Sequence, residues 1–286
     1  MTHLIALPDG RTIAVDDQGS SDGAVVVFLH AAPGSRRLDP DPEATAEAGV
    51  RLLTLDRPGY GASSPVTEAV PTIDSIADDL ARALSTLDVG PAAIVGWSAG
   101  GRVALAVAAR HPHLVRSVGV VATPAPDEAV PWVPEQFRAM TPGVRADPAG
   151  AVPMLAGAFA AFVDAPDQAV ESVTGGPADD VVLADPAPRD RLVAMLAEAF
   201  RAGAEGAAAD VIALNVVPDD VQLREIAVAV GAPVSLFYGD ADAVAGPEHG
   251  RWWERSIPDS ALHVIPGAGH LVALTAWHDI LAAVTT

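Results

Sequence analysis

Short apolar runs alternate with helical patterns along most of the chain. Six of these runs are only six to eight residues long, are rich in β-branched residues and end at polar, Gly or Pro positions. Such runs are typical of buried strands. They cover residues 24–30, 50–56, 92–97, 117–122, 233–240 and 261–266.

Two segments between these runs have the apolar spacing of helices. They are residues 72–88 and 99–112, and the second ends at Pro112. The first residues predict a β-hairpin, because their alternation breaks at Pro8-Asp9-Gly10 and then resumes. This order of strands and helices predicts an α/β fold, with a mostly parallel central sheet flanked by helices.

The pattern changes between residues 127 and 224. Strand-like runs nearly vanish there, and Ala-rich helical stretches alternate with loops of Pro, Gly and Asp. The segment also holds four of the six phenylalanines and three of the four methionines. We therefore predict a first core part at residues 1–126, an inserted helical cap or lid at 127–224, and a second core part at 225–286.

The charge balance narrows the possible partners. The chain of 286 residues has 37 acidic residues against 17 arginines and no lysine, and its net charge is −20. A surface this acidic repels phosphate backbones and anionic lipids, so we expect a small-molecule substrate and no nucleic-acid or membrane partner. Cysteine is absent, which excludes disulfides, thiolate nucleophiles and cysteine-ligated metals.

The N-terminal residues show no basic region followed by an apolar run. No uninterrupted apolar stretch reaches the roughly 18 residues that a membrane-spanning helix needs. These two observations predict a cytoplasmic protein. The sequence makes no prediction of the oligomeric state.

A candidate nucleophile lies where a predicted strand meets a predicted helix. The segment Gly96-Trp97-Ser98-Ala99-Gly100 has the form G-x-S-x-G. In this context the form is typical of a sharp turn that exposes a serine above the sheet, since small flanking residues prevent a clash. We predict that Ser98 is the nucleophile. The alternative is a glycine-rich turn that serves only helix packing.

A serine hydroxyl needs a base to take its proton. The chain has eight histidines, and we expect the base to be His270, which lies in a Gly-rich loop after a strand. Ligands of open α/β sheets bind at that edge. His249 and His278 lie in helical patterns, where we expect solvated side chains.

The base needs a carboxylate to orient it. Asp240 and Asp242 both follow the strand at 233–240. We favour Asp242, further into the loop, and expect Asp240 to shape the turn. Asp127 is a third and weaker candidate.

An acyl-transfer site also needs hydrogen-bond donors for the oxyanion. One predicted donor is the backbone N–H of Ala99, directly after the nucleophile. The other is the N–H of Ala32 in the loop "HAAPGS", where Pro33 restricts the backbone. The alternative is that this loop is an ordinary strand-to-helix turn.

Together these segments resemble the α/β-hydrolase superfamily over nearly the whole chain. "HAAPGS" resembles the family's oxyanion loop, "LDRPGYGASS" its D-x-P-G-x-G-x-S segment and "GWSAGG" its nucleophile turn. "YGDADAVAGPEHG" resembles the acid loop and "GAGH" the histidine loop. The resemblance implies the same roles for Ser98, Asp242 and His270, with Ala32 and Ala99 as oxyanion donors.

One position departs from the family pattern, since Ala31 stands where a glycine is usual. A serine nucleophile also argues against the epoxide-hydrolase and haloalkane-dehalogenase branches, which use a carboxylate. The resemblance implies neither a metal nor an organic cofactor.

The predicted function is therefore a serine hydrolase that cleaves an ester or related acyl bond through an acyl-enzyme. The apolar insertion suggests a small, fairly hydrophobic substrate, with Trp97, Trp132, Phe159 and Phe162 as candidate binding residues. The same triad also serves C–C bond hydrolysis, amidase or aminopeptidase action, acyl transfer and cofactor-free perhydrolysis. A non-enzymatic ligand receptor on this fold is the remaining alternative.

Overall fold

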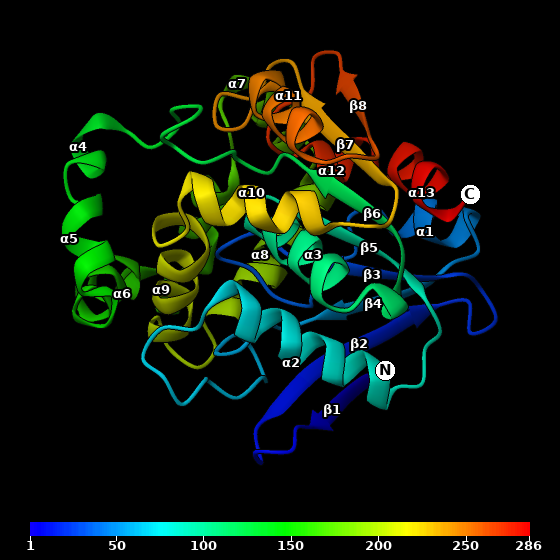
Figure 1. The fold of residues 1–286 in the computed structure, drawn as a ribbon, viewed down its shortest axis with the longest axis horizontal. Coiled ribbons are helices and arrows are strands. Elements are labelled where there is room, and N and C mark those ends of the chain that lie inside the picture. Colours follow the sequence, from blue (N-terminus) through cyan, green and yellow to red (C-terminus); the bar gives the residue numbers. More distant parts are fainter.

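A computed structural model describes all 286 residues, and its centre is an eight-stranded sheet (Figure 1). The strand order across the sheet is β1-β2-β4-β3-β5-β6-β7-β8. Their bounds are β1 Thr2–Ala6, β2 Thr12–Gly19, β3 Val25–Leu29, β4 Arg51–Leu55, β5 Ala92–Trp97, β6 Val115–Val121, β7 Val234–Gly239 and β8 Ser260–Ile265.

The sheet is mostly parallel, as predicted. Only β1 with β2 and β2 with β4 pair antiparallel, so the predicted N-terminal hairpin is confirmed. The strands from β4 to β8 run parallel. The carboxyl ends of the parallel strands therefore share one edge, where the loops after β3, β5, β7 and β8 meet.

Helices cover both faces of the sheet. Successive residues of a strand point to opposite sides, so each strand contributes side chains to an apolar cluster on each face. Val27 and Leu29 of β3 pack in one apolar cluster, and Val26 and Phe28 pack in the other. The first cluster includes side chains from α2 (Ile73–Thr86), α3 (Ala99–Arg110), α10 (Asp220–Ala229) and α11 (Pro247–Ser256). The second includes side chains from α1 (Pro42–Glu47), α8 (Pro186–Ala199), α12 (Val272–Thr275) and α13 (Trp277–Thr285).

Local sequence explains where the helices on these faces begin. Thr72 caps α2, and Ser75 returns a hydrogen bond to its backbone, which is a capping box. The buried side of α2 carries Ile73, Ile76 and Leu80 at helical spacing. In Figure 1, α1 and α13 lie side by side although they come from opposite parts of the chain.

The chain between β6 and β7 is helical and contains no strand. We refer to α4 through α9 as the helical insertion; α4, α5 and α6 gather at the left of Figure 1. The bounds are α4 Glu135–Arg138, α5 Thr141–Ala146, α6 Pro148–Asp164, α7 Pro177–Leu183, α8 as above and α9 Glu205–Val211. The predicted division into a core and a separate lid stays a prediction.

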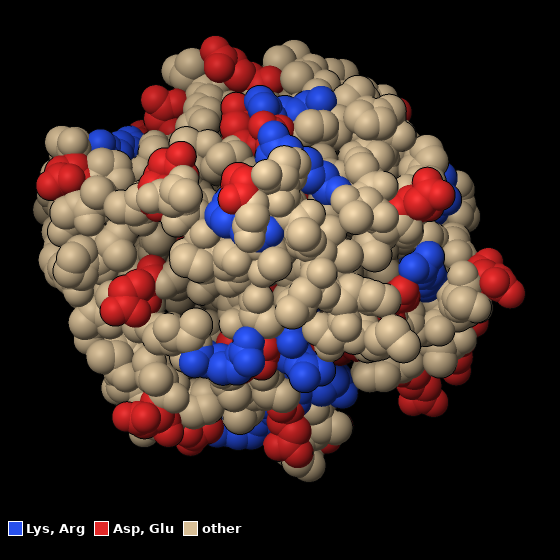
Figure 2. All heavy atoms as spheres, turned by 90° about the horizontal axis from the view of Figure 1, so that it is seen from below, with Lys and Arg blue, Asp and Glu red and all other residues tan.

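Acids and arginines are interspersed on the face drawn in Figure 2, and most of that face is uncharged. No helix is both long and apolar enough to cross a membrane.

Candidate active site

Ser98 lies in a sharp turn between β5 and α3. Its backbone has φ +54° and ψ −123°, a sparsely populated conformation that costs a non-glycine residue on the order of 1–3 kcal/mol. The flanking glycines are required by close packing. A Cβ at Gly96 would collide with the backbone of Gly100 and Gly101, and a Cβ at Gly100 would collide with the carbonyl of Leu29.

The end of β6 holds this turn in place. The Ser98 N–H donates to the carbonyl of Val121 at 2.8 Å. The Thr123 hydroxyl donates to the Ser98 carbonyl, also at 2.8 Å. Gly101 lies so close to Thr123 that any side chain there would collide with its hydroxyl. The neighbouring strand therefore sustains the strained conformation of the candidate nucleophile.

The structure brings the three predicted residues Ser98, His270 and Asp242 into one hydrogen-bonded line. The Nε2 atom of His270 is 3.1 Å from the Ser98 Oγ. Its Nδ1 atom is 2.8 Å from the Asp242 Oδ2. The imidazole and the carboxylate are buried, whereas Ser98 is partly exposed. The arrangement allows a proton to pass from the hydroxyl to an imidazole that a carboxylate holds in place.

Asp242 is held as a carboxylate. Burial alone would raise its pKa, but the positive charge that His270 can carry and their hydrogen bond lower it. The N–H groups of Val244 and Ala245 donate to Oδ1 at 2.7 and 3.0 Å, which also favours the charged form. The net effect is that the pKa of Asp242 lies below its ordinary value.

The other two carboxylate candidates, Asp240 and Asp127, form hydrogen bonds with other groups. Asp240 is exposed, and its Oδ1 accepts from the Gly267 N–H at 2.6 Å, so it shapes the turn. Asp127 accepts from the N–H groups of Trp132 and Val133 and pairs with Arg138. Neither has a hydrogen bond to His270.

The two predicted oxyanion donors have free N–H groups. Ala99 is the first residue of α3, where an N–H has no partner within the helix. Neither the Ala99 N–H nor the Ala32 N–H donates to any group of the protein outside regular elements. Ala31 does not adopt a positive φ, and its side chain is buried, so the backbone here tolerates a methyl where the family has glycine.

A buried ion pair supports the loop that carries Ala32. The Arg57 side chain donates to the carbonyls of His30 and Ala31 at 2.5 and 3.0 Å. Its other N–H groups donate to both carboxylate oxygens of Asp210 in α9, at 2.9 and 2.7 Å. Burial alone would lower the pKa of Arg57, but Asp210 keeps it above its ordinary value.

His30 supports the same loop and is held neutral. Burial and the Arg57 charge place the pKa of His30 well below its ordinary value. Its Nδ1 is 2.7 Å from the Ala31 carbonyl, and its Nε2 accepts from the Arg57 N–H at 3.4 Å. This pattern fits a neutral imidazole with its proton on Nδ1.

Sequence reasoning missed Asp179, a fully buried residue of α7 that contacts the histidine loop. Its carboxylate accepts from the N–H groups of His270 and Leu271 at 3.1 and 2.9 Å, and from Gly175 at 2.5 Å. A side chain at Gly269 would collide with it. The helical insertion thus supplies a side chain that positions the backbone of His270.

The four candidate substrate-binding residues occupy different surroundings. Trp97 is fully buried, and its indole N–H donates to the His270 carbonyl at 2.9 Å, so it supports the backbone of His270. Phe159 and Phe162 of α6 stack on each other at 5.9 Å and contact Phe200. Trp132 lies under the guanidinium of Arg102, 6.0 Å from the ring centre.

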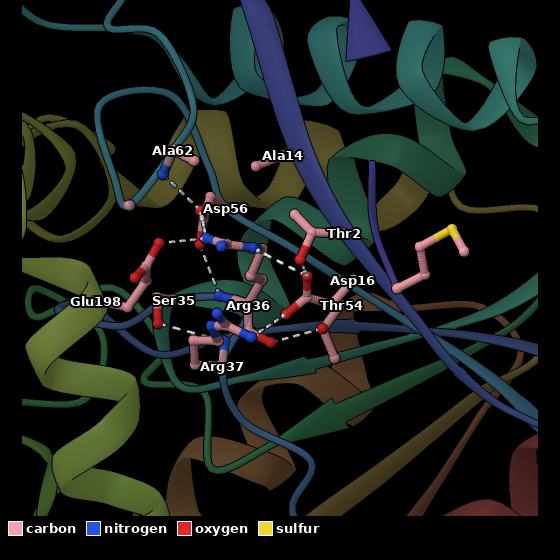
Figure 3. A network of polar contacts seen from close by, with 12 residues as sticks. Thr2, Ala14, Asp16, Ser35, Arg36, Arg37, Thr54, Asp56, Ala62 and Glu198 are labelled. Carbon is pink, nitrogen blue, oxygen red and sulfur yellow. Dashed lines mark hydrogen bonds and ion pairs between the residues drawn. The ribbon is translucent and has the colours of Figure 1, made fainter. Parts of the chain in front are cut away.

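A second buried network lies just after the oxyanion loop (Figure 3). Arg36 pairs with Asp16, with Asp56 and, at 2.6 Å, with Glu198 of α8. Its backbone N–H donates to Asp56 at 2.7 Å. Figure 3 shows the guanidinium between these three carboxylates, so the network joins the insertion to the loop.

A cavity of about 570 Å³ lies between α3 and the helical insertion. Side chains of α4, α5, α6 and α9 line it, together with Arg102 of α3 and residues after β6. Arg102 is one helical turn from Ser98, which does not itself line the cavity. No group of three or more His, Asp or Glu side chains is placed to hold a metal ion.

Comparisons with known proteins agree with this fold. Pimeloyl-[acyl-carrier protein] methyl ester esterase of Chromobacterium violaceum is 32% identical over 232 residues, 80% of each chain. A 2-hydroxy-6-oxononadienedioate/2-hydroxy-6-oxononatrienedioate hydrolase of Burkholderia vietnamiensis is 31% identical over 143 residues, 48% of this chain and 50% of that one.

A thermophilic esterase from Thermogutta terrifontis superposes with a TM-score of 0.71 at 25% identity, covering 99% of this chain and 96% of the other. The profile of the alpha/beta hydrolase fold matches residues 24–276. The chain therefore belongs to the alpha/beta-hydrolase superfamily, as its motifs predicted, and these relatives support a hydrolase.

Proposed function

We propose that this hydrolase cleaves an ester or related acyl bond of a small, fairly hydrophobic molecule through an acyl-enzyme on Ser98. The observation that carries the proposal is the line of hydrogen bonds from Ser98 through His270 to Asp242, set in a strained turn at the start of α3. The esterase names of relatives in Chromobacterium violaceum and Thermogutta terrifontis support an ester as substrate.

In the proposed reaction, His270 takes the Ser98 proton as the oxygen attacks the acyl carbonyl. Asp242 holds the imidazole and stabilises its positive charge. The N–H groups of Ala32 and Ala99 donate to the oxyanion. The tetrahedral intermediate then breaks as His270 gives the proton to the leaving alcohol, and water repeats the sequence on the acyl-enzyme.

The helical insertion serves in this proposal as the lid that gives the site its apolar side. Its α7 and α9 already contribute Asp179 and Asp210, which hold the histidine loop and the oxyanion loop. We propose a small-molecule substrate with no nucleic acid, membrane, metal or organic cofactor involved.

The test is turnover of a panel of short and long acyl esters and matched amides by the wild type and Ser98→Ala. We expect the esters to be hydrolysed and the variant to lose at least about a thousandfold in kcat. Ser21→Ala, on an exposed loop, is the matched control and should keep full activity.

Labelling with an active-site phosphonate distinguishes the proposed function from the remaining alternatives. Wild type should be labelled at Ser98, and Ser98→Ala should not. Ester turnover that persists in Ser98→Ala contradicts the assigned nucleophile. A labelled protein that cleaves amides but no ester contradicts the assigned bond type.

A further inference from the structure

The cavity beside α3 has an unusual charge balance for this protein. Five charged side chains line it, and three of them are arginines. Asp127 pairs with Arg138, and Glu128 pairs with Arg145. The fifth is Arg102, so a chain with a net charge of −20 has a cavity wall with one surplus positive charge.

Arg102 is a fully buried cation without a carboxylate partner. Its Nη atoms donate only to main-chain carbonyls, at Leu214, Pro124 and Ala125. Burial lowers its pKa to about 10, which still leaves it charged at neutral pH. Charges buried in proteins are normally paired, because an unpaired one loses its hydration without compensation.

Three buried polar atoms in this region have no hydrogen-bond partner. They are the Nε of Arg102, the Nε1 of Trp132 and the Oδ1 of Asn215. Arg102 and Asn215 line the cavity, and the Arg102 guanidinium lies over the Trp132 ring. Buried polar groups are rarely left unsatisfied, so two such atoms, on Arg102 and Asn215 in the wall of one cavity, indicate a polar group of a ligand.

Apart from Thr141, the rest of the lining is apolar. Phe137, Met140, Met154, Leu155 and Ile212 contribute hydrocarbon side chains, and the cavity volume lies within the about 300–1,000 Å³ of small-molecule sites. A ligand that fits both parts has an uncharged chain and one anionic group.

We propose that this cavity binds a carboxylate group carried by the substrate, with Arg102 as its counter-charge and the Asn215 amide as a second donor. The inference rests on the proposed function and names the substrate class as an ester or related acyl compound with a free carboxylate. Arg102 follows Ser98 by one turn, about 6 Å along the axis of α3, so a substrate that extends from the cavity to Ser98 needs to span only about this length.

Monomethyl adipate and dimethyl adipate are a matched pair of probes that differ in one negative charge. Binding is measured calorimetrically on Ser98→Ala at 0.15 M salt, and hydrolysis is measured on the wild type. We expect the monoester to bind about ten- to a hundredfold more tightly, as a charge-assisted hydrogen bond allows. We expect kcat/KM to favour it by a similar factor.

Arg102→Met and Asn215→Leu should reduce this preference, the first abolishing it. Arg110→Met is the matched control, because Arg110 lies on the same helix in exposed pairs with Asp74 and Asp78. It should keep the full preference. If Arg102→Met does not fold, Asn215→Leu carries the test, since it removes the amide from the cavity wall and keeps a side chain of similar size.

Equal binding of the two probes overturns the inference, as does a preference that survives both substitutions. Hydrolysis of both esters without preference overturns it while leaving the proposed function intact. Preferential binding of the monoester by a protein that hydrolyses neither ester supports the anion site and contradicts the proposed function.

Discussion

At the scale of single residues, the two aspartates after β7 show how position decides chemistry. Asp242 is buried, lies 2.8 Å from the His270 Nδ1 and has a pKa below its ordinary value. Asp240, two residues earlier, is exposed and holds the turn through Gly267. The same type of side chain thus pairs with the imidazole at position 242 and stabilises a turn at position 240.

Asp242→Asn should lower kcat by about three to four orders of magnitude, because the amide can no longer favour the imidazole proton on Nδ1. Asp240→Asn keeps an oxygen for the Gly267 N–H and should stay within about threefold of wild type in kcat. The measurement is kcat and KM for one ester that the wild type turns over. A larger loss in Asp240→Asn would reverse the assignment.

Much of the candidate site could be predicted from sequence, because each predicted residue carries a local signal. Ser98 lies between glycines at a strand-to-helix junction, and His270 follows a strand in a Gly-rich loop. Asp179 has no such signal: it lies 91 residues from His270, and it acts by accepting main-chain N–H groups. Only the folded chain shows that proximity.

One histidine prediction is wrong for a similar reason. His249 was expected to be solvated because it lies in a helical pattern, but it is buried and accepts from the Ala125 N–H at 3.1 Å. Burial lowers its pKa. A helical pattern shows which residues share a face, whereas the packing of α11 on the sheet decides which face is covered.

At the scale of elements, the insertion and the core are joined at the loops that carry the candidate site residues. Asp179 of α7 holds the histidine loop, Asp210 of α9 neutralises the arginine behind the oxyanion loop, and Glu198 of α8 pairs with Arg36. The alternation of strands and helices predicted the core elements closely. It contained no information on these long-range carboxylates, because each depends on how the insertion packs.

Asp179→Asn should lower kcat about ten- to a hundredfold with KM little changed, because the new NH2 group must face one of the N–H groups that the carboxylate accepts. Labelling of Ser98 by a phosphonate should slow by a similar factor. Asp180→Asn, at the exposed neighbouring position, is the control and should match wild type. A large rise in KM with unchanged kcat would show that Asp179 acts on substrate binding and does not position the base.

At the scale of the whole molecule, stability should depend on pH through buried histidines. The pKa of His30 is well below its ordinary value of about 6.5 in the folded protein and returns to it on unfolding. Below pH 6.5 the unfolded chain therefore binds a proton that the folded chain does not, and stability falls as the pH drops toward the folded pKa. Above pH 6.5 this contribution is constant.

Urea unfolding at pH 7.5, 6.5 and 5.5 measures this dependence. The free energy of unfolding should fall by up to about 1.4 kcal/mol per pH unit for His30 below pH 6.5, with His249 adding to it. His30→Gln should be less stable at pH 7.5 but show a shallower slope. Identical slopes in the two proteins would mean that His30 is not the responsible group.

The positive φ of Ser98 has a consequence for engineering. Glycine adopts that conformation without strain, so a search for more stable variants of this protein should favour glycine at position 98. The variant that stability selects would lack the hydroxyl group that the proposed chemistry requires. Thermostability screens without an activity readout would therefore enrich for inert protein, and position 98 should be held fixed in any such library.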